Sequence, residues 1–300
     1  MKLREHLEQQ GATEHMITLI CRITDLCKDI ANAILHQQGK AGTVNIHGDE
    51  QIALDTWADD HMIQGLRESK LVKTVASEEQ DEVVEILKSD GEFGVTLDPL
   101  DGSSLIDVNL SIGTIVGIFE EGNVMEKGEK LDAALYVVYG PLTTLVYTIK
   151  KGVHEFVLNE IGDFILRKEN LQIPQGKLYA PGGLAKDYLP WHSNYIKALG
   201  EKGYKLRYSG GMVPDVNQIL HKGGIFTYPA LQEKNQGKLR LLFECNPLSF
   251  IIVQAGGACS DGKQSILTKT PQGIGDRTPI YVGNKDAVLL AEKFCYESDQ

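Results

Sequence analysis

Residues 94–104 read GVTLDPLDGSS, an apolar run that leads into two aspartates, a glycine and two serines. The run GVTL (94–97) predicts a strand that ends at Asp98. Asp98 and Asp101 can point at one centre, where oxygen ligands would hold a hard cation such as Mg²⁺. The backbone N–H groups of residues 102–104 carry no bulky side chains and can cradle a phosphate. A cation site beside a phosphate cradle indicates phosphate-ester hydrolysis, in which positioning and charge neutralisation lower the barrier.

Other interpretations of this segment are weaker in context. An isolated Asp-Pro-x-Asp is most often a turn with solvated carboxylates. A calcium loop of the EF-hand type would need the D-x-D-x-D-G spacing and a later glutamate, which this stretch lacks. An aspartyl-phosphate enzyme would want D-x-D after a hydrophobic strand, whereas the spacing here is D-x-x-D.

Further carboxylates follow two other predicted strands. Glu78 and Glu79 come after the strand-like run 71–76, and Glu244 follows KLRLLF (238–243). An acidic pair alone is most often exposed, but the ends of two neighbouring strands would bring Glu78 close to Asp98. For Glu244, a functional and a surface role are equally good interpretations of the sequence alone. In most proteins Asp49 would be a helix cap and Asp55 a helix-surface residue.

Basic and hydroxyl side chains form a second group on strand-like segments. They are Arg207, Tyr208, Tyr228, Lys238 and Arg240. In an acidic protein, clustered cations indicate an anion site, although ordinary ion pairing also explains them. Each tyrosine could give a hydroxyl to a sugar or phosphate, or could be a core residue with a polar tip.

The order of apolar residues predicts layers of helix and sheet. Periods of three and four predict helices from about Thr13 to a stop at Gly39–Gly42 and over 50–67. Residues 111–167 are mostly strand-like, with runs apolar on both faces, and later segments alternate strand and helix. The Pro- and Gly-rich stretch 173–183 predicts a joint between an N-terminal subdomain, 1–172, and a C-terminal subdomain, 173–300. We therefore expect a mixed α/β fold.

Composition narrows the class of protein further. The chain has 300 residues, 42% of them hydrophobic, and its net charge is −11. That content supports a full core, and the negative charge argues against nucleic acid or an anionic membrane as partners. No apolar run approaches the about 20 residues that span a bilayer. Five cysteines without metal-binding spacing indicate reduced thiols, so we expect a cytoplasmic protein.

Taken together, these segments resemble class 1 fructose-1,6-bisphosphatase and its relative sedoheptulose-1,7-bisphosphatase. The similarity covers roughly residues 43 to 285. The segments that carry it are GDEQIALD (48–55), SEE (77–79), LDPLDGSS (97–104), SIGTIVGIF (111–119), LRYSGGMVPDV (206–216), GGIFTYPA (223–230), KLRLLFECNP (238–247) and AGG…DGKQSIL (255–267).

The resemblance implies a layered αβαβα sugar-phosphatase fold and a homodimer or homotetramer. It implies hydrolysis of the 1-phosphate of fructose 1,6-bisphosphate to fructose 6-phosphate and inorganic phosphate by a metal-activated water. The cofactor would be two to three Mg²⁺ per subunit, with Mn²⁺ as an alternative.

The resemblance also assigns roles to residues. The metal ligands it implies are Glu78, Asp98, Leu100 (through its carbonyl), Asp101 and Glu244. The catalytic carboxylates it implies are Asp49, Asp55, Glu78 and Glu79. The substrate-binding residues it implies are Asp101, Gly102, Ser103, Ser104, Tyr208, Tyr228, Lys238 and Arg240, together with Arg207, which would reach a neighbouring active site.

Departures from the family pattern bear on regulation and specificity. Residues 12–18 (ATEHMIT) and Glu92-Phe93 stand where AMP-inhibited members have other residues, which argues against AMP inhibition. YAPGGLA (179–185) resembles the sedoheptulose enzyme, whereas Tyr228-Pro229 resembles the fructose enzyme. A sedoheptulose-1,7-bisphosphatase or a dual-specificity enzyme is therefore the alternative. A non-catalytic regulator that binds metal and sugar phosphate is a remote third.

Overall fold

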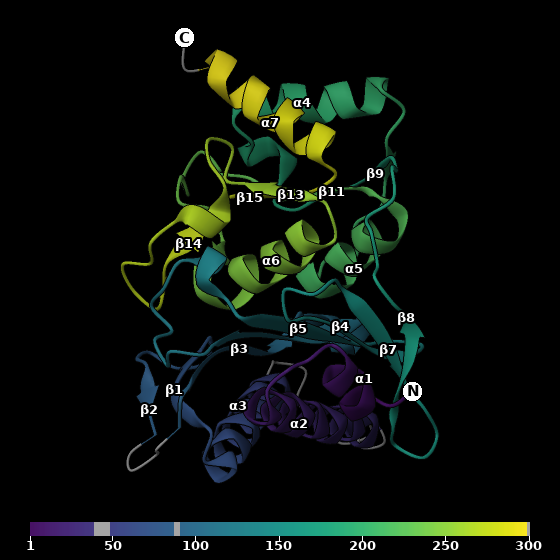
Figure 1. Ribbon diagram of the computed structural model, residues 1–300. Helices are drawn as coiled ribbons and strands as arrows, with labels where there is room; N and C mark the ends of the chain where they lie inside the picture. The colour runs from purple at the N-terminus through teal and green to yellow at the C-terminus, as the bar shows by residue number, and fades with distance from the viewer. Residues whose placement is uncertain (39–48, 87–90, 299–300) are drawn as a thin grey trace.

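Five layers of helix and sheet make up the protein. The computed structural model describes residues 1–38, 49–86 and 91–298. The predicted stop of the first helix at Gly39–Gly42 and the side chain of Asp49 lie outside the described residues. The order of layers is helices, a large sheet, two helices, a smaller sheet and two helices (Figure 1). This arrangement confirms the mixed, layered fold expected from the sequence.

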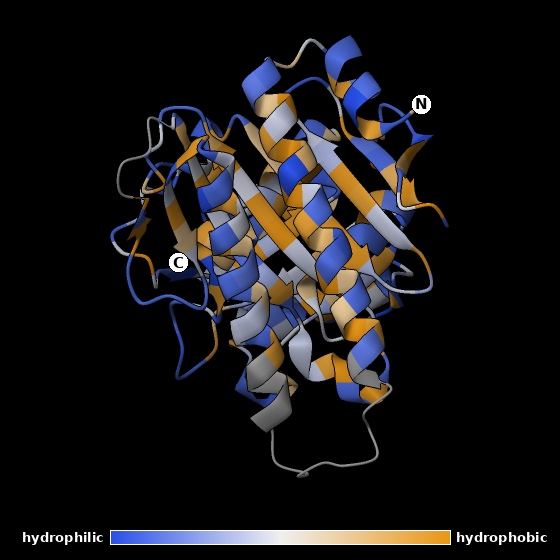
Figure 2. Ribbon diagram, turned by 90° about the horizontal axis from the view of Figure 1, so that it is seen from below, coloured by the Kyte–Doolittle hydropathy of each residue, from blue (hydrophilic) through white to orange (hydrophobic). Residues whose placement is uncertain are grey.

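The first layer covers one face of the large sheet. It contains α1 (Leu3–Gln9), α2 (Glu14–Gln38) and α3 (Asp49–Ser69). Their apolar faces pack on the strands, and Ile20, Ile23 and Leu66 are fully buried there. Seen from the helix side, the outward turns are largely hydrophilic and apolar strands lie behind them (Figure 2). The seven residues of α1 were not predicted as a helix.

The large sheet has eight strands in the order β2-β1-β3-β4-β5-β6-β7-β8. Its strands are β1 (Val72–Ser77), β2 (Val84–Glu85), β3 (Phe93–Asp101), β4 (Ile112–Phe119), β5 (Ala133–Tyr139), β6 (Thr143–Thr148), β7 (His154–Leu158) and β8 (Phe164–Lys168). Every residue of β3, β4 and β5 is buried, because helices cover both faces at the centre of the sheet. Burial on both faces explains the continuous apolar runs of β4 and β5, whereas β7 and β8 are partly exposed.

The C-terminal half supplies the other three layers. The middle layer is α5 (Met212–Lys222) and α6 (Asn246–Gln254). The smaller sheet has the order β10-β9-β11-β15-β13. Its strands are β9 (Leu178–Pro181), β10 (Lys205–Leu206), β11 (Gly224–Tyr228), β13 (Ala258–Ser260) and β15 (Ile280–Gly283), and α4 (Pro190–Glu201) and α7 (Lys285–Ser298) cover it.

Residues from both halves share one core between the two sheets. Ile115 and Tyr136 of the large sheet pack in the same cluster as Val216 of α5 and Ile251 of α6. A separate pair of short strands, β12 (Leu239–Arg240) and β14 (Arg277–Thr278), lies beside this core. The subdomain boundary at 172/173 stays a prediction.

Two strand predictions near the site are wrong in extent. Of KLRLLF (238–243), only Leu239–Arg240 is strand, and Leu241–Cys245 forms a π-helical turn. Of residues 206–208, only Leu206 belongs to a strand, so Arg207 and Tyr208 follow it. Leu241, Leu242 and Phe243 are buried on all sides, and a uniformly apolar run does not distinguish strand from helix.

The helix α4 also went unpredicted. Among the residues described, no helix is both long and apolar enough to cross a membrane.

Candidate active site

The acidic residues converge because β1 and β3 are parallel neighbours. Ser77 pairs with Leu97, and the backbone N–H of Glu78 donates a 3.0 Å hydrogen bond to the carbonyl of Leu97. Glu78 therefore lies beside Asp98 at the same end of the sheet. The side-by-side strand ends expected from the sequence are present.

A local irregularity in β3 turns Asp98 and Asp101 toward one centre. Side chains three positions apart face opposite sides of a regular strand. The register between β3 and β4 shifts between these two aspartates, where Pro99 and Leu100 intervene. Asp98 Oδ1 accepts the backbone N–H of Leu100 at 3.0 Å. The strand continues to Asp101 rather than ending at Asp98, and the irregularity lets both carboxylates reach the same point.

Glu244 completes a cluster of three buried carboxylates. One oxygen from each of Asp98, Asp101 and Glu244 lies within 4.8 Å of the others, and the residues are 3%, 8% and 6% exposed. Burial, followed by the charge of Glu78, raises the pKa of Asp98 and of Glu244 well above the usual range. Burial likewise raises the pKa of Asp101 to about 6. Crowded carboxylates of this kind fit a hard divalent cation, which takes oxygen ligands.

The segment after Asp101 has the form of an anion cradle. Gly102 has φ +81°, a left-handed conformation that strains any residue with a Cβ. A short 3₁₀ helix, η1 (Ser103–Val108), follows it. The hydroxyl of Ser103 donates a 3.0 Å hydrogen bond to Asp55 Oδ2 on α3. The cradle is thereby tied to the first helical layer.

Asp55 and Glu79 form a second acidic pair next to the cluster. Burial raises the pKa of Asp55 to about 6, the bond from Ser103 opposes that rise, and the charge of Glu78 adds to it. Burial, then the charges of Asp55 and Glu78, raises the pKa of Glu79. Two such carboxylates can hold one proton between them near neutral pH.

A cavity of about 280 Å³ joins the carboxylates to the basic and aromatic residues. The predicted site residues that line it are Glu78, Glu79, Asp98, Leu100, Asp101, Gly102, Ser103, Ser104, Tyr208, Tyr228, Lys238 and Glu244. Within this lining, Lys238 Nζ lies 5.7 Å from the centre of the Tyr228 ring. A second hollow of about 470 Å³ shares Tyr208, Tyr228 and Lys238 and extends to Leu184 and Lys234.

Three predicted residues lie off this cavity. Asp55 reaches it only through Ser103. Arg240 does not line it: its Nε lies 3.5 Å from Glu78 Oε1, and its Nη1 donates to the carbonyl of Gly275. The direct sugar or phosphate contact expected of Arg240 stays a prediction. Arg207 is exposed outside the cavity, as a residue that serves a neighbouring subunit would be.

Other residues line the cavity that the sequence did not single out. They are Gly210, Gly211, Met212, Phe226, Leu239 and Arg277. All of these except Arg277 lie inside the matched segments, so the resemblance could have found them. Arg277 lies within the span of the similarity, 43 to 285, but in none of the quoted segments, and the β12–β14 pairing reveals its place.

Comparison with known proteins agrees with this geometry. The sequence model "Fructose-1-6-bisphosphatase, N-terminal domain" matches residues 1–169, and "Fructose-1-6-bisphosphatase, C-terminal domain" matches residues 173–296. The chain belongs to the fructose-1,6-bisphosphatase family. The family predicted from the sequence is confirmed.

Individual relatives of the fructose-1,6-bisphosphatase family match over almost the whole chain. "Fructose-1,6-bisphosphatase class 1" of Trichlorobacter lovleyi is 47% identical, covering 97% of this chain and 94% of the relative. The protein of the same name from Geotalea uraniireducens is 48% identical, covering 99% and 96%. The crystal structure of Leishmania major fructose-1,6-bisphosphatase in holo form has a TM-score of 0.91 at 30% identity, covering 98% of each chain.

Proposed function

We propose that the protein hydrolyses the 1-phosphate of fructose 1,6-bisphosphate, giving fructose 6-phosphate and inorganic phosphate. The observation that carries the proposal is one cavity lined by two unlike groups of residues. One group is the buried carboxylates Asp98, Asp101 and Glu244 with the cradle, and the other is Lys238 with two tyrosines. A molecule with phosphates at both ends suits this arrangement, and the curated relatives carry the matching name.

The reaction depends on divalent cations, for which we propose two to three Mg²⁺ per subunit, with Mn²⁺ as a substitute. Asp98, Asp101, Glu244, Glu78 and the carbonyl of Leu100 would hold them. The chemistry of the donor set fits, because three carboxylates are buried together, and burial followed by neighbouring negative charges raises the pKa of Asp98 and of Glu244. When bound, the cations would neutralise negative charge on the phosphoryl oxygens and lower the pKa of the attacking water.

The protein's own groups position the substrate and move the proton. The backbone N–H groups of Gly102, Ser103 and Ser104 would hold the oxygens of the departing phosphate. Asp55 and Glu79, whose pKa values burial raises, would orient the water and take its proton. The Ser103 hydroxyl holds Asp55 in place at 3.0 Å. We propose that Glu78 is a third catalytic carboxylate and that Asp49, whose side chain is not described, is a fourth.

Tyr208, Tyr228 and Lys238 would bind the phosphate that is not hydrolysed. Burial raises the pKa of Tyr208 to about 12, so its hydroxyl keeps its proton and can donate to an anion. We also propose that Arg207 reaches the active site of a neighbouring copy in a homodimer or homotetramer. Its exposure beside Leu206 and Tyr208, which are 57% and 42% exposed, supports a contact surface there.

Dual specificity is the second candidate, and the adjoining hollow favours it. The cavity continues past Tyr228 and Lys238 into a space of about 470 Å³ that reaches Leu184. That space gives room for a phosphate carried one carbon farther from the reacting end, as in sedoheptulose 1,7-bisphosphate. We propose a cytoplasmic location, because the five cysteines are odd in number and lack metal-binding spacing, and reduced cysteines of this kind are typical of that compartment.

Phosphate release from the two bisphosphates in parallel tests these proposals. With Mg²⁺ present, kcat/KM for fructose 1,6-bisphosphate should equal or exceed that for sedoheptulose 1,7-bisphosphate. Comparable values would establish dual specificity, and a strong preference for sedoheptulose would displace the first proposal. Metal and sugar-phosphate binding without turnover of either substrate would show the non-catalytic regulator.

A further inference from the structure

Arg277 brings a positive charge to the cavity that the sequence comparison did not assign. It lies on β14, its side chain is exposed, and it lines the cavity together with Lys238. Its Nη1 donates a hydrogen bond to the backbone carbonyl of Lys238. The guanidinium is therefore tied to the backbone of Lys238, and within the described residues its other four N–H donors have no hydrogen-bond partner.

The charge of Arg277 lacks a carboxylate partner within the described residues. Arg277 stands directly opposite Arg240 in the β12–β14 pair. Like charges at opposite positions of an antiparallel pair are destabilising. Glu78 neutralises Arg240 at 3.5 Å, whereas none of the ion pairs in the described part of the chain includes Arg277. A bound anion would offset the repulsion that remains.

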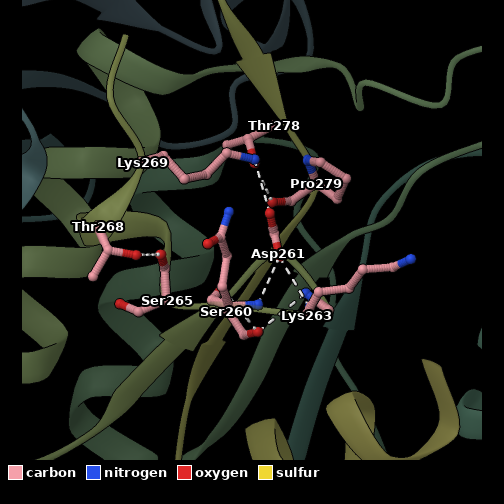
Figure 3. Close-up of polar contacts among 10 residues, drawn as sticks. Ser260, Asp261, Lys263, Ser265, Thr268, Lys269, Thr278 and Pro279 are labelled. Carbon is pink, nitrogen blue, oxygen red and sulfur yellow. Dashed lines mark hydrogen bonds and ion pairs between the residues drawn. The ribbon is translucent and has the colours of Figure 1, made fainter. Parts of the chain in front are cut away.

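A polar network anchors the strand that carries Arg277. The neighbouring Thr278 is fully buried, and its hydroxyl accepts a 3.0 Å hydrogen bond from Lys269 Nζ. Lys269 also pairs with Asp261 at 2.8 Å, and Asp261 in turn accepts the backbone N–H of Lys263 (Figure 3). These contacts fix β14 on the C-terminal half of the molecule.

Close backbone packing joins β14 to the segment of Lys238. Gly237, directly before Lys238, has φ +80°, and a Cβ there would stand 2.5 Å from the backbone N of Pro279. Only glycine fits this approach. Lys238 and Arg277 are thus held on neighbouring stretches of backbone, and both residues line the same cavity.

We propose that Arg277 binds the non-reacting phosphate of the substrate next to Lys238. The inference deepens the proposed function and rests on it. A guanidinium with several free donors matches a phosphate geometrically, and charge-assisted bonds of this kind are among the stronger ones. Because the group touches no reacting atom, it stabilises the bound substrate and the transition state equally.

Steady-state kinetics of Arg277→Gln, Arg277→Lys and Arg67→Gln test the inference. Arg67 is exposed near the C-terminal end of α3 and controls for the loss of one positive charge. Arg277→Gln should raise KM for fructose 1,6-bisphosphate about tenfold and leave kcat within about twofold. The KM of Arg277→Lys should lie between those of the unaltered protein and Arg277→Gln. The KM and kcat of Arg67→Gln should match those of the unaltered protein. An unchanged KM, or a loss confined to kcat, would overturn the proposal.

A double-substitution cycle separates direct contact from support of Lys238. If Arg277 only positions Lys238 through its carbonyl, Arg277→Gln should have no effect in a Lys238→Gln background. A direct contact predicts that KM rises again, by at least about fivefold, in that background. If KM does not rise again in the Lys238→Gln background, direct binding by Arg277 is overturned. Thermal midpoints of all variants identify any that are misfolded, and Arg277→Lys then decides in place of Arg277→Gln.

Titration calorimetry with fructose 6-phosphate distinguishes failure of this inference from failure of the proposed function. That ligand carries only the non-reacting phosphate, so its binding needs no turnover. Arg277→Gln should weaken it about tenfold relative to both the unaltered protein and Arg67→Gln. Equal affinities, or no binding to the unaltered protein, would overturn the inference even if turnover is found. Weakened binding without turnover would uphold the inference and reject the proposed hydrolysis.

Discussion

Asp101 Oδ2 accepts a 2.7 Å hydrogen bond from the backbone N–H of Val213, at the first turn of α5. The bond joins a carboxylate of the large sheet to a helix of the middle layer. A helix N-terminus favours negative charge, and the N–H groups of Val213 and Met212 lower the pKa of Asp101 against the rise that burial causes. The acidic cluster is therefore built across the joint between the two halves of the chain.

Asp98→Asn should remove nearly all turnover, at least about 100-fold in kcat, while the protein stays folded. The substitution deletes a carboxylate from the cluster that would hold the cations, and it relieves repulsion among buried charges. The thermal midpoint without added metal should therefore stay the same or rise. Phosphate release and thermal unfolding measure both effects, with the exposed Asp286→Asn as the control. Undiminished turnover would contradict the site assignment.

The sequence predicted the chemistry of the site better than its assembly. Asp98, Asp101 and the residues after them were identified by type and spacing alone. Their convergence with Glu244 depends on pairings between distant segments, and a single sequence contains no record of those contacts. Arg277 illustrates this limit, since it reaches the cavity only because β14 pairs with β12, whose Arg240 lies 37 positions earlier. The contact between Arg240 and Glu78 was not predicted for the same reason, because the two residues are distant in sequence.

Arg207→Ala should raise KM far more than it lowers kcat, because the group would touch a phosphate that does not react. If Arg207 serves a neighbouring subunit, a mixed assembly of Arg207→Ala and Asp98→Asn chains contains one complete site. Co-assembly of these two variants should then restore low-KM turnover that neither shows by itself. Kinetics before and after mixing under subunit-exchange conditions measure this. A mixture no better than the sum of its parts would place Arg207 outside any shared site.

Asp215 should make stability fall as the pH rises from about 4 to about 6. Burial raises its pKa from 3.8 to about 6, although the backbone N–H of Ser209 and the side chain of Gln218 stabilise the ionised form. A raised pKa in the folded state means that its contribution is complete below the unfolded value of 3.8. That contribution is lost as the pH passes through the folded value. Asp215→Asn lacks this pH-dependent contribution to stability. The difference in thermal unfolding midpoint between the unaltered protein and the variant should therefore shrink as the pH rises from about 4 to about 6. A constant difference would refute the assignment.

Lys269→Met should cost about 2 kcal/mol of unfolding free energy, because it leaves the half-buried Asp261 carboxylate without its cation. The bond from Lys269 lowers the pKa of Asp261 even though burial would raise it. Lys293→Met is the matched control, since its pair with Glu297 is exposed on α7 and worth less than about 0.5 kcal/mol. Urea unfolding of both variants measures the difference. Equal losses of unfolding free energy in the two variants would show that the pair of Lys269 with Asp261 stabilises the fold no more than an exposed pair does.

Mg²⁺ should raise the thermal midpoint of the unaltered protein by a few degrees. Binding to the folded chain alone stabilises it by about 2.7 kcal/mol at a concentration 100 times the Kd. Repulsion among Asp98, Asp101 and Glu244, which burial strengthens, destabilises the folded protein, and a bound cation would remove that repulsion. NaCl at matched ionic strength should give little of this rise, and Asp98→Asn should lose most of it. An equal Mg²⁺ effect in both proteins would mean that the ion binds elsewhere, so the variant comparison locates the metal independently of any assay of turnover.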